Sequence, residues 1–147
     1  MAEFQIEREV VIDAPVAVVW RTITEPEQIR QWFADRVELE LEAGGRGLMG
    51  FEDRAFPLVV EAVEPLSRFS FRWNQPAGEE PAAGNSTLVE FTLVGEGERT
   101  RLRVVESGLE PLAWPVGDKE RFADEHRGGW AMYTDRLARL LAERPRE

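Results

Sequence analysis

The residue best suited to acid–base chemistry is His126, the only histidine in the sequence. A histidine side chain exchanges its proton near neutral pH, so it can act as a general acid or base. Tyr133 follows two helical turns later on the same side of a predicted helix, and these two side chains form the one acid–base pair that we consider. No Asp, Ser or Cys close in the sequence marks His126 as part of a nucleophilic catalytic set. We therefore assign no catalytic residue. The alternative interpretation is a histidine that is hydrogen-bonded in the wall of a cavity or at its rim.

Aromatic residues make up 10% of the sequence, and their positions give the main indication of a binding site. Several alternate with polar residues in predicted strands, and others share a helical stripe with His126, so they can converge between a sheet and a helix. An ordinary hydrophobic core has the same pattern, because aromatic side chains dominate cores in general. The polar groups of His126 and Tyr133 favour a cavity, since a dry core would have to satisfy both. The predicted ligand-binding residues are Trp32, Phe33, Phe51, Phe71, Trp73, Phe91, His126, Trp130, Tyr133 and Leu137.

The segment 45–50 matches the spacing G-x-G-x-x-G of dinucleotide-binding loops. That motif needs a helix directly after it, whose first turn meets the pyrophosphate, but here a strand pattern follows from Phe51. We therefore interpret the segment as a turn and a strand in which glycine relieves crowding. A metal site is not indicated, because the sequence has one histidine and no cysteine, and acidic pairs such as Glu79 and Glu80 lie in a predicted loop. The sequence predicts neither a cofactor nor a metal.

The chain has 147 residues, which we interpret as a single domain over residues 1–147. The formal net charge of −10 argues against binding to nucleic acid, because an acidic surface repels phosphates. This charge serves solubility or, alternatively, attracts a basic protein partner. The sequence has no signal-peptide pattern and no apolar run long enough to span a membrane, and the absence of cysteine suits a reducing compartment. We predict a cytoplasmic protein without a membrane partner.

The last four of the predicted site residues belong to a long amphipathic helix over residues 118–141. Asp118 is its predicted N-cap. Gly128 and Gly129 lie in the middle of this helix, where each glycine costs roughly 1 kcal/mol relative to alanine. We attribute the two glycines to close packing of another segment against the helix backbone, and a hinge is the alternative.

The preceding residues supply strands that this helix can pack against. Residues 3–12 alternate apolar and charged side chains and predict a strand, after which Pro15 opens a short helix. Thr24 and Glu27 have the spacing of a capping box and predict a second short helix. Alternating or short apolar patterns then predict six strands, joined by short turns into an antiparallel meander, over residues 37–41, 48–52, 56–63, 69–73, 88–93 and 101–104.

The predicted fold class is α+β. A curved antiparallel sheet of about six or seven strands wraps around a long C-terminal helix, and two short helices follow the first strand. Residues 75–85 are rich in Pro, Ala, Gly and Glu and predict a mobile loop. The tail, residues 143–147, is expected to be frayed.

Eight short motifs keep an order and spacing that together suggest a family. They are Ile12-x-Ala14-Pro15, Val19-Trp20, Thr24-x-Pro26, Trp32-Phe33, Glu64-Pro65, Thr100-x-Leu102, Glu106-Ser107-Gly108 and Gly129-Trp130. On these motifs, nearly the whole chain resembles the START-like (SRPBCC) superfamily with the helix-grip fold. Within it, the chain is most similar to single-domain bacterial proteins that resemble the C-terminal domain of the heat-shock-protein-90 ATPase activator.

The resemblance implies a deep cavity between the sheet and the last helix, which many relatives use for small apolar molecules. We expect such a molecule as the partner. One alternative is a chaperone-associated or stress-response interaction domain, although the activator's separate N-terminal domain has no counterpart in this sequence. Another is a cyclase or hydrolase that would use His126 and Tyr133. The resemblance implies no single activity and leaves both a monomer and a dimer open.

Overall fold

The computed structural model describes residues 4–143. Along the chain a strand comes first, two short helices follow, six more strands come next, and a long helix ends the described part. These elements are β1 (Ile6–Ile12), α1 (Val16–Thr24), α2 (Pro26–Ile29), β2 (Arg36–Leu39), β3 (Arg46–Phe51), β4 (Arg54–Glu64), β5 (Arg68–Trp73), β6 (Thr87–Glu96), β7 (Arg99–Ser107) and α3 (Val116–Glu143).

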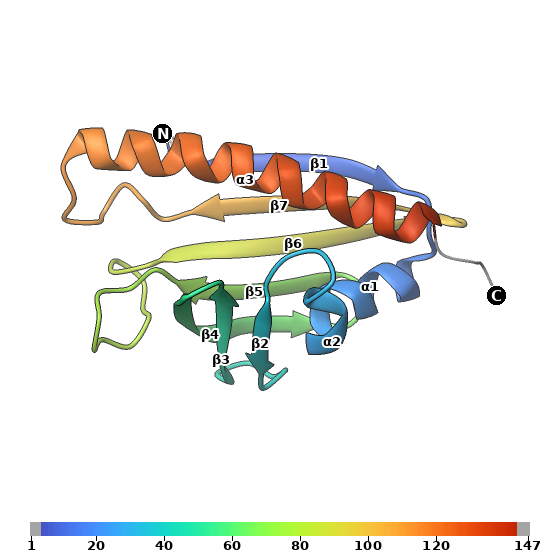
Figure 1. Cartoon of the computed structure of the whole chain (residues 1–147), viewed down its shortest axis with the longest axis horizontal. Helices are drawn as coiled ribbons and strands as arrows, with labels where there is room; N and C mark the ends of the chain where they lie inside the picture. The colour runs from blue at the N-terminus through green and yellow to red at the C-terminus, as the bar shows by residue number, and fades with distance from the viewer. Residues whose placement is uncertain (1–3, 144–147) are drawn as a thin grey trace.

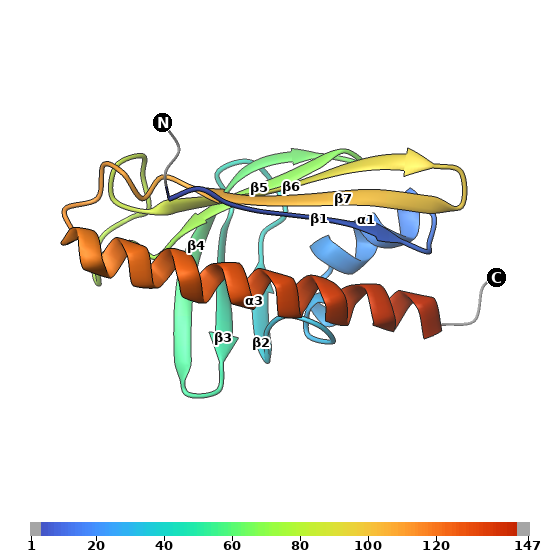
Figure 2. The same ribbon diagram turned by 90° about the horizontal axis from the view of Figure 1, so that it is seen from above.

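The seven strands form one antiparallel sheet in the order β1-β7-β6-β5-β4-β3-β2. In Figure 1, α3 runs alongside β1 and β7, and α1 and α2 lie near its C-terminal end. Figure 2 shows that α3 crosses one face of the sheet and that the β3–β4 hairpin reaches past it. The sheet therefore curves around the helix, and the fold predicted from the sequence is confirmed.

The two faces of the sheet differ because side chains alternate along each strand. On the inner face, β6 and β7 bury a continuous set of side chains that is apolar except for two threonines and one glutamate. This set consists of Thr87, Val89, Phe91, Leu93, Thr100, Leu102, Val104 and Glu106. The pairing of β4 with β5 shifts between Val60 and Ala62, and such a bulge bends a sheet.

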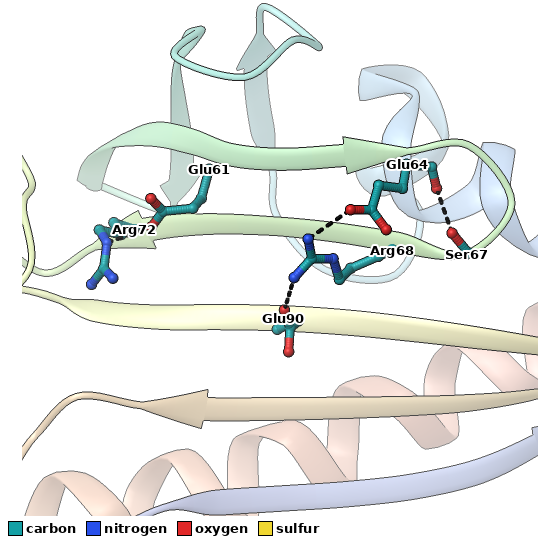
Figure 3. Close-up of polar contacts among 6 residues, drawn as sticks. All are labelled: Glu61, Glu64, Ser67, Arg68, Arg72 and Glu90. Carbon is teal, nitrogen blue, oxygen red and sulfur yellow. Dashed lines mark hydrogen bonds and ion pairs between the residues drawn. The ribbon is translucent and has the colours of Figure 1, made fainter.

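The outer face of the sheet carries ion pairs between neighbouring strands (Figure 3). Arg68 bonds to Glu64 at 2.6 Å and to Glu90 at 3.0 Å, and Arg72 bonds to Glu61 at 2.5 Å. The same pattern continues on β1 and β7, where the pairs are Glu7–Arg103 and Glu9–Arg101. Arg72 and Arg103 alternate with buried neighbours along β5 and β7, so both lie on this face.

Helix α3 begins at Val116, two residues before the predicted start. The carbonyl oxygen of Pro115 accepts hydrogen bonds from the backbone N–H groups of Asp118 and Lys119, at 3.0 and 3.2 Å. The prediction that Asp118 is the N-cap is therefore wrong. Asp118 lies inside the first turn, where its carboxylate pairs with Arg121 and favours the positive end of the helix dipole.

The glycines of α3 are not explained by close packing. A Cβ atom at Gly128 would have nothing within 4 Å, and one at Gly129 would meet only the Tyr133 ring, at 3.9 Å. The packing prediction is therefore wrong, because Gly128 faces outward and Gly129 borders open space. In β3 the opposite holds, since a Cβ at Gly47 would lie 2.6 Å from the carbonyl oxygen of Glu38. The interpretation of segment 45–50 as a crowded strand is confirmed.

The predicted capping box between α1 and α2 is wrong. Thr24 is still part of α1, and its hydroxyl donates to the carbonyl oxygen of Trp20 at 2.7 Å instead of capping α2. Glu25 occupies the N-cap position of α2 without a side-chain hydrogen bond. Of the predicted frayed tail, residues 144–147 lie outside the described residues.

Candidate functional site

A pocket of about 590 Å³ lies between the first half of α3 and the strands β3, β4 and β5. The residues that follow α2, the start of the loop after β5 and the connection from β7 to α3 complete its wall. Most of the lining side chains are aromatic. The lining residues are Phe33, Phe51, Arg54, Phe56, Trp73, Asn74, Gln75, Trp114, Phe122, Glu125, His126, Gly129, Trp130 and Tyr133.

Glu106 lies behind this wall and is fully buried. It is the residue of β7 that faces inward after Leu102 and Val104, so the strand's alternation carries its carboxylate into the core. Four hydrogen bonds hold the two carboxylate oxygens. Oε1 accepts from His126 Nδ1 at 2.5 Å and from Trp130 Nε1 at 2.9 Å. Oε2 accepts from Trp73 Nε1 at 2.9 Å and from the hydroxyl of Thr87 at 2.8 Å.

The surroundings of Glu106 favour its charged form. Burial is the strongest single influence and by itself raises the pKa of a carboxyl group. The hydrogen bond and charge of His126, together with the hydrogen bonds from Trp130 and Trp73, outweigh burial, so the pKa of Glu106 is lowered below its ordinary value. The side chain is therefore an anion, and among residues 4–143 neither an arginine nor a lysine bonds to it.

His126 connects this buried carboxylate to the pocket. Its side chain is 25% exposed, and its ring stacks on Phe122 with 3.7 Å between centroids and 20° between planes. The edge of the ring faces Trp73 at 6.4 Å. Within residues 4–143, Nδ1 bonds to Glu106 and Nε2 has no hydrogen-bond partner. This arrangement leaves one imidazole nitrogen available to a molecule in the pocket.

Phe33 is the centre of the aromatic wall. It stacks on Trp130, with 5.2 Å between centroids and 15° between planes. Tyr133 and Phe51 meet it edge-on at 4.9 and 5.2 Å, and Trp73 is tilted against it at 5.9 Å. Offset stacking and edge-to-face contacts are the favoured geometries of aromatic pairs, so the wall is held in shape by its own contacts.

Polar groups stand at the margin of the pocket. The guanidinium of Arg54 lies 5.1 Å from the centroid of Phe56, a cation–π distance. Partial burial raises the pKa of Tyr133; nearby Arg136 lowers it and Asp35 raises it, and the net direction is upward. The Tyr133 hydroxyl therefore keeps its proton at neutral pH and can donate a hydrogen bond.

The structure brings together six of the ten predicted site residues. Phe33, Phe51, Trp73, His126, Trp130 and Tyr133 line the pocket. The other four are core residues that do not line it. Phe71 packs against Trp73, and Phe91 packs against Trp32 and Trp130, so these rings lie one layer further inside. Leu137 is fully buried almost two turns beyond Trp130.

Sequence reasoning missed the residue that organises the site. Glu106 shares the inward parity of Leu102 and Val104, which places a carboxylate in the core but does not identify its partners. Phe122 lines the pocket from α3 but is not among the predicted site residues. The remaining lining residues that were missed come from strand ends, loops and the next positions of α3, and they are Arg54, Phe56, Asn74, Gln75, Trp114, Glu125 and Gly129.

The chemistry available in the pocket is acid–base chemistry and hydrogen bonding. Among the described residues that line it, none is a serine, threonine or cysteine, so the wall supplies no hydroxyl or thiol nucleophile of these types. In the part of the chain that the structure describes, no group of three or more His, Cys, Asp or Glu residues could hold a metal ion. No helix among residues 4–143 is long and apolar enough to cross a membrane.

A second pocket, also of about 590 Å³, lies under residues 74–81 beside β3 and β4. One aromatic ring, Phe56, contributes to its lining, and the exposed ion pair between Arg46 and Glu80 stands at its wall. No histidine lines it. The candidate functional site is therefore the aromatic pocket next to His126.

Comparison with solved structures gives a consistent fold. The protein MLL2253 from Mesorhizobium loti superposes with a TM-score of 0.80 at 25% identity, over 97% of this chain and 99% of that one. DynU16, a protein of the dynemicin biosynthetic locus, superposes with a TM-score of 0.77 at 30% identity. That match covers 96% of this chain but 48% of DynU16, so this chain spans about half of its length.

The Aha1 dimer from Colwellia psychrerythraea has the same fold, with a TM-score of 0.75 at 17% identity, over 93% of this chain and 95% of that one. Comparison with curated protein sequences gives no match. The model of one family, described as activator of Hsp90 ATPase homolog 1-like protein, matches residues 13–142. This match spans most of the chain, which therefore belongs to the activator of Hsp90 ATPase homolog 1-like family, with a START-like fold.

Proposed function

We propose that this protein binds a small, mostly apolar molecule in the aromatic pocket between the sheet and α3. The observation that carries the proposal is a pocket of about 590 Å³ whose wall is mostly aromatic and in which a single imidazole has a free nitrogen. Pockets for small ligands are typically of roughly 300–1,000 Å³, apolar, with a few polar groups that orient the ligand. We also propose that the protein acts in the cytoplasm.

Ring contacts would supply most of the affinity. An indole-sized ring buries roughly 200 Å², and at about 25 cal/mol per Å² this gives roughly 5 kcal/mol before the cost of association. Phe33 and Trp130 are held by their stacking, so little side-chain freedom is lost on binding. The imidazole and the Tyr133 hydroxyl would set the orientation of the ligand.

The glycines of α3 provide a matched test. Gly129 borders the pocket, whereas a side chain at Gly128 would enter open solvent, so Gly129→Leu fills the pocket and Gly128→Leu does not. Both substitutions raise helix propensity by the same amount. We expect native mass spectrometry to detect a co-purifying apolar molecule on wild type and Gly128→Leu, and to lose it on Gly129→Leu. Retention of the molecule by Gly129→Leu would place binding elsewhere.

A second candidate function is that of a chaperone-associated domain. Two observations favour it: the family is described by an activator of the Hsp90 ATPase, and the outer face of the sheet presents rows of charged side chains (Figure 3). On this proposal the purified protein raises the ATPase rate of a bacterial Hsp90, and the effect weakens as salt screens the charges. An unchanged ATPase rate at low salt would argue against it.

We also make a proposal about whether this chain is a monomer or a dimer. The Aha1 of Colwellia psychrerythraea is described as a dimer, and this chain has the same fold. We propose that the monomer and a dimer are both accessible to this chain, and light scattering over a concentration series would measure their proportions.

A further inference from the structure

Arg54 differs from most arginines of this chain. Most of those among residues 4–143 bond to a carboxylate, as Arg68 and Arg72 do on the outer face of the sheet. Within the same residues Arg54 has no carboxylate at ion-pair distance, and its guanidinium lies over the ring of Phe56 instead. A guanidinium is always charged at neutral pH. A positive charge that is not paired with a carboxylate of the described residues therefore lines the pocket.

The strand pairing directs Arg54 to the pocket side of the sheet. Arg54 is opposite Phe51 in the pairing of β3 with β4 and two residues before Phe56, so the three side chains leave the same face. Phe51 and Phe56 both line the pocket, and their ring centroids are 5.8 Å apart. Arg54 itself is exposed. Its guanidinium therefore stands at the mouth of the pocket, where a bound group can contact it and still reach water.

Tyr133 adds a hydrogen-bond donor at this end of the pocket. Its ring centroid lies 6.3 Å from that of Phe51, and no side chain among residues 4–143 bonds to its hydroxyl. Partial burial raises the pKa of Tyr133, so the hydroxyl keeps its proton. The guanidinium of Arg136 lies 5.5 Å from the centre of the same ring. A hydroxyl donor and a second cation therefore accompany Arg54.

The acidic groups on the first half of α3 lie toward the other end of the pocket. Glu125 precedes Tyr133 by eight residues, which is roughly 12 Å along the helix axis. His126 precedes Tyr133 by seven residues, or roughly 10 Å. The pair of His126 and Glu106 is therefore distant from the mouth, whichever of the two holds the proton between them.

The carboxylates nearer to the mouth do not cancel its positive charge. Asp35 acts on the pKa of Tyr133 less strongly than Arg136 does. One oxygen of Asp35 already accepts the backbone N–H of Glu52, at 2.6 Å. Glu52 and Asp53 form the exposed turn of the β3–β4 hairpin, where water and salt screen their charges. The mouth of the pocket therefore offers two donors, a guanidinium and a hydroxyl, to an anionic group.

We propose that the ligand is a carboxylic acid whose apolar body fills the aromatic wall and whose carboxylate bonds to Arg54 and Tyr133 at the mouth. This inference rests on the proposed binding function of the pocket. The planar guanidinium has parallel N–H donors that match the two oxygens of a carboxylate. At the exposed mouth the carboxylate also keeps part of its hydration, so binding costs less free energy than full burial of the charge would.

Two probes of nearly equal shape test the charge: 2-naphthoate, a carboxylate at neutral pH, and 2-naphthamide, which is neutral. We expect wild type to bind 2-naphthoate about fivefold more tightly in isothermal titration calorimetry at low salt, and added salt should reduce this preference. Arg54→Gln should bind both probes with similar affinity. Arg21→Gln is the control, because it removes the same charge from the exposed surface of α1, away from the lining, and it should keep the wild-type preference.

Tyr133→Phe separates the hydrogen bond from the charge. The variant keeps a ring against Phe33 but loses the hydroxyl. A carboxylate and an amide carbonyl both accept from a hydroxyl, so this variant should weaken the binding of both probes and keep the preference for 2-naphthoate. A preference that disappears in Tyr133→Phe and persists in Arg54→Gln would overturn the role of Arg54.

The outcomes separate the carboxylate proposal from the binding function. Equal affinity of wild type for the two probes, or tighter binding of the amide, would overturn the carboxylate proposal and leave an apolar binding pocket. If neither probe binds but native mass spectra show a retained molecule, its chemical class decides: a carboxylic acid supports the proposal, and any other class overturns it. Binding of neither probe without a retained molecule would overturn the binding function itself. Loss of both probes in Gly129→Leu, with retention in Gly128→Leu, would place them in this pocket and support both proposals.

Discussion

On the outer face of the sheet, the carboxylates of Glu64 and Glu90 bond to the guanidinium of Arg68, and all three side chains reach water (Figure 3). On the inner face, the carboxylate of Glu106 has no exposed atom, and three of its four donors are neutral side chains, from Trp73, Thr87 and Trp130. Both faces thus carry glutamates on neighbouring strands. They differ in whether water or the protein solvates the charge.

This difference determines what each carboxylate contributes. Exposed ion pairs typically add only about 0–1 kcal/mol, because water solvates both partners and side-chain entropy is lost. A buried anion must be matched by donors, and each donor left without its acceptor costs about 1–3 kcal/mol. The outer pairs can therefore be exchanged with small effects, whereas the four contacts to Glu106 must be kept together.

The largest expected effect is that of Glu106→Gln. The amide has nearly the same shape, but its NH₂ group faces two donors that need an acceptor. We expect a loss of about 2–4 kcal/mol of unfolding free energy in urea titrations. Glu90→Gln, the same change on the neighbouring strand's outer face, is the control and should lose less than about 1 kcal/mol. Equal losses in both variants would contradict the distinction between the faces.

The pH dependence of stability tests the same contrast. The pKa of Glu106 is lowered in the folded state from its ordinary value of 4.5, so the unfolded chain binds the proton more readily. The stabilisation is therefore complete above the ordinary value and is lost as pH falls through the folded pKa. The difference in unfolding free energy between wild type and Glu106→Gln should shrink as urea titrations move from neutral pH into this acidic range. A difference that stays constant or grows in acid would refute the assignment.

A smaller effect is expected from Thr87→Val. This change removes one of the donors to Glu106 but keeps the side-chain shape, and we expect a loss of about 1 kcal/mol. Thr92→Val makes the same change on the outward parity of the same strand, where the valine should be neutral within about 0.5 kcal/mol. Thermal or urea unfolding of the two variants compares the faces within one strand. A larger loss from Thr92→Val would reverse the comparison.

The smallest effect is expected from Arg72→Gln on the outer face. The variant loses the pair with Glu61, which bridges β4 and β5 (Figure 3). Its unfolding free energy should fall by less than that of Thr87→Val, and high salt should abolish the difference from wild type, because salt screens exposed charges. A difference in unfolding free energy that persists in high salt would show that Arg72 does not stabilise the protein mainly through an exposed, salt-screened ion pair.

The fold followed from local patterns in the sequence. Two-residue alternation located the strands, a helical stripe located α3, and short turns between strands predicted antiparallel neighbours. Two predicted helix caps were wrong for local reasons, because the carbonyl oxygen of Pro115 accepts the first hydrogen bonds of α3 in place of Asp118, and Thr24 bonds back within α1.

The candidate site was only partly accessible to the same reasoning. Its aromatic members were predicted because their positions in the strands and in α3 face inward. The rings of the core face inward too, so the sequence pattern does not separate the rings that line the pocket from those packed behind it. The contacts of Glu106 join residues that are 19 to 33 positions apart in the chain. Periodicity within one element carries no information on such pairings, so His126 was found and its carboxylate partner was not.

Two of the five tryptophans, Trp73 and Trp130, line the pocket and point their indole N–H groups at the same negative charge. Indole emission depends on the electric field along the ring, so both fluorophores sense the ionisation of that carboxylate and the polarity of whatever occupies the space beside them. The protein thus contains its own optical reporter. The wavelength and intensity of its natural fluorescence should record occupancy without any added label.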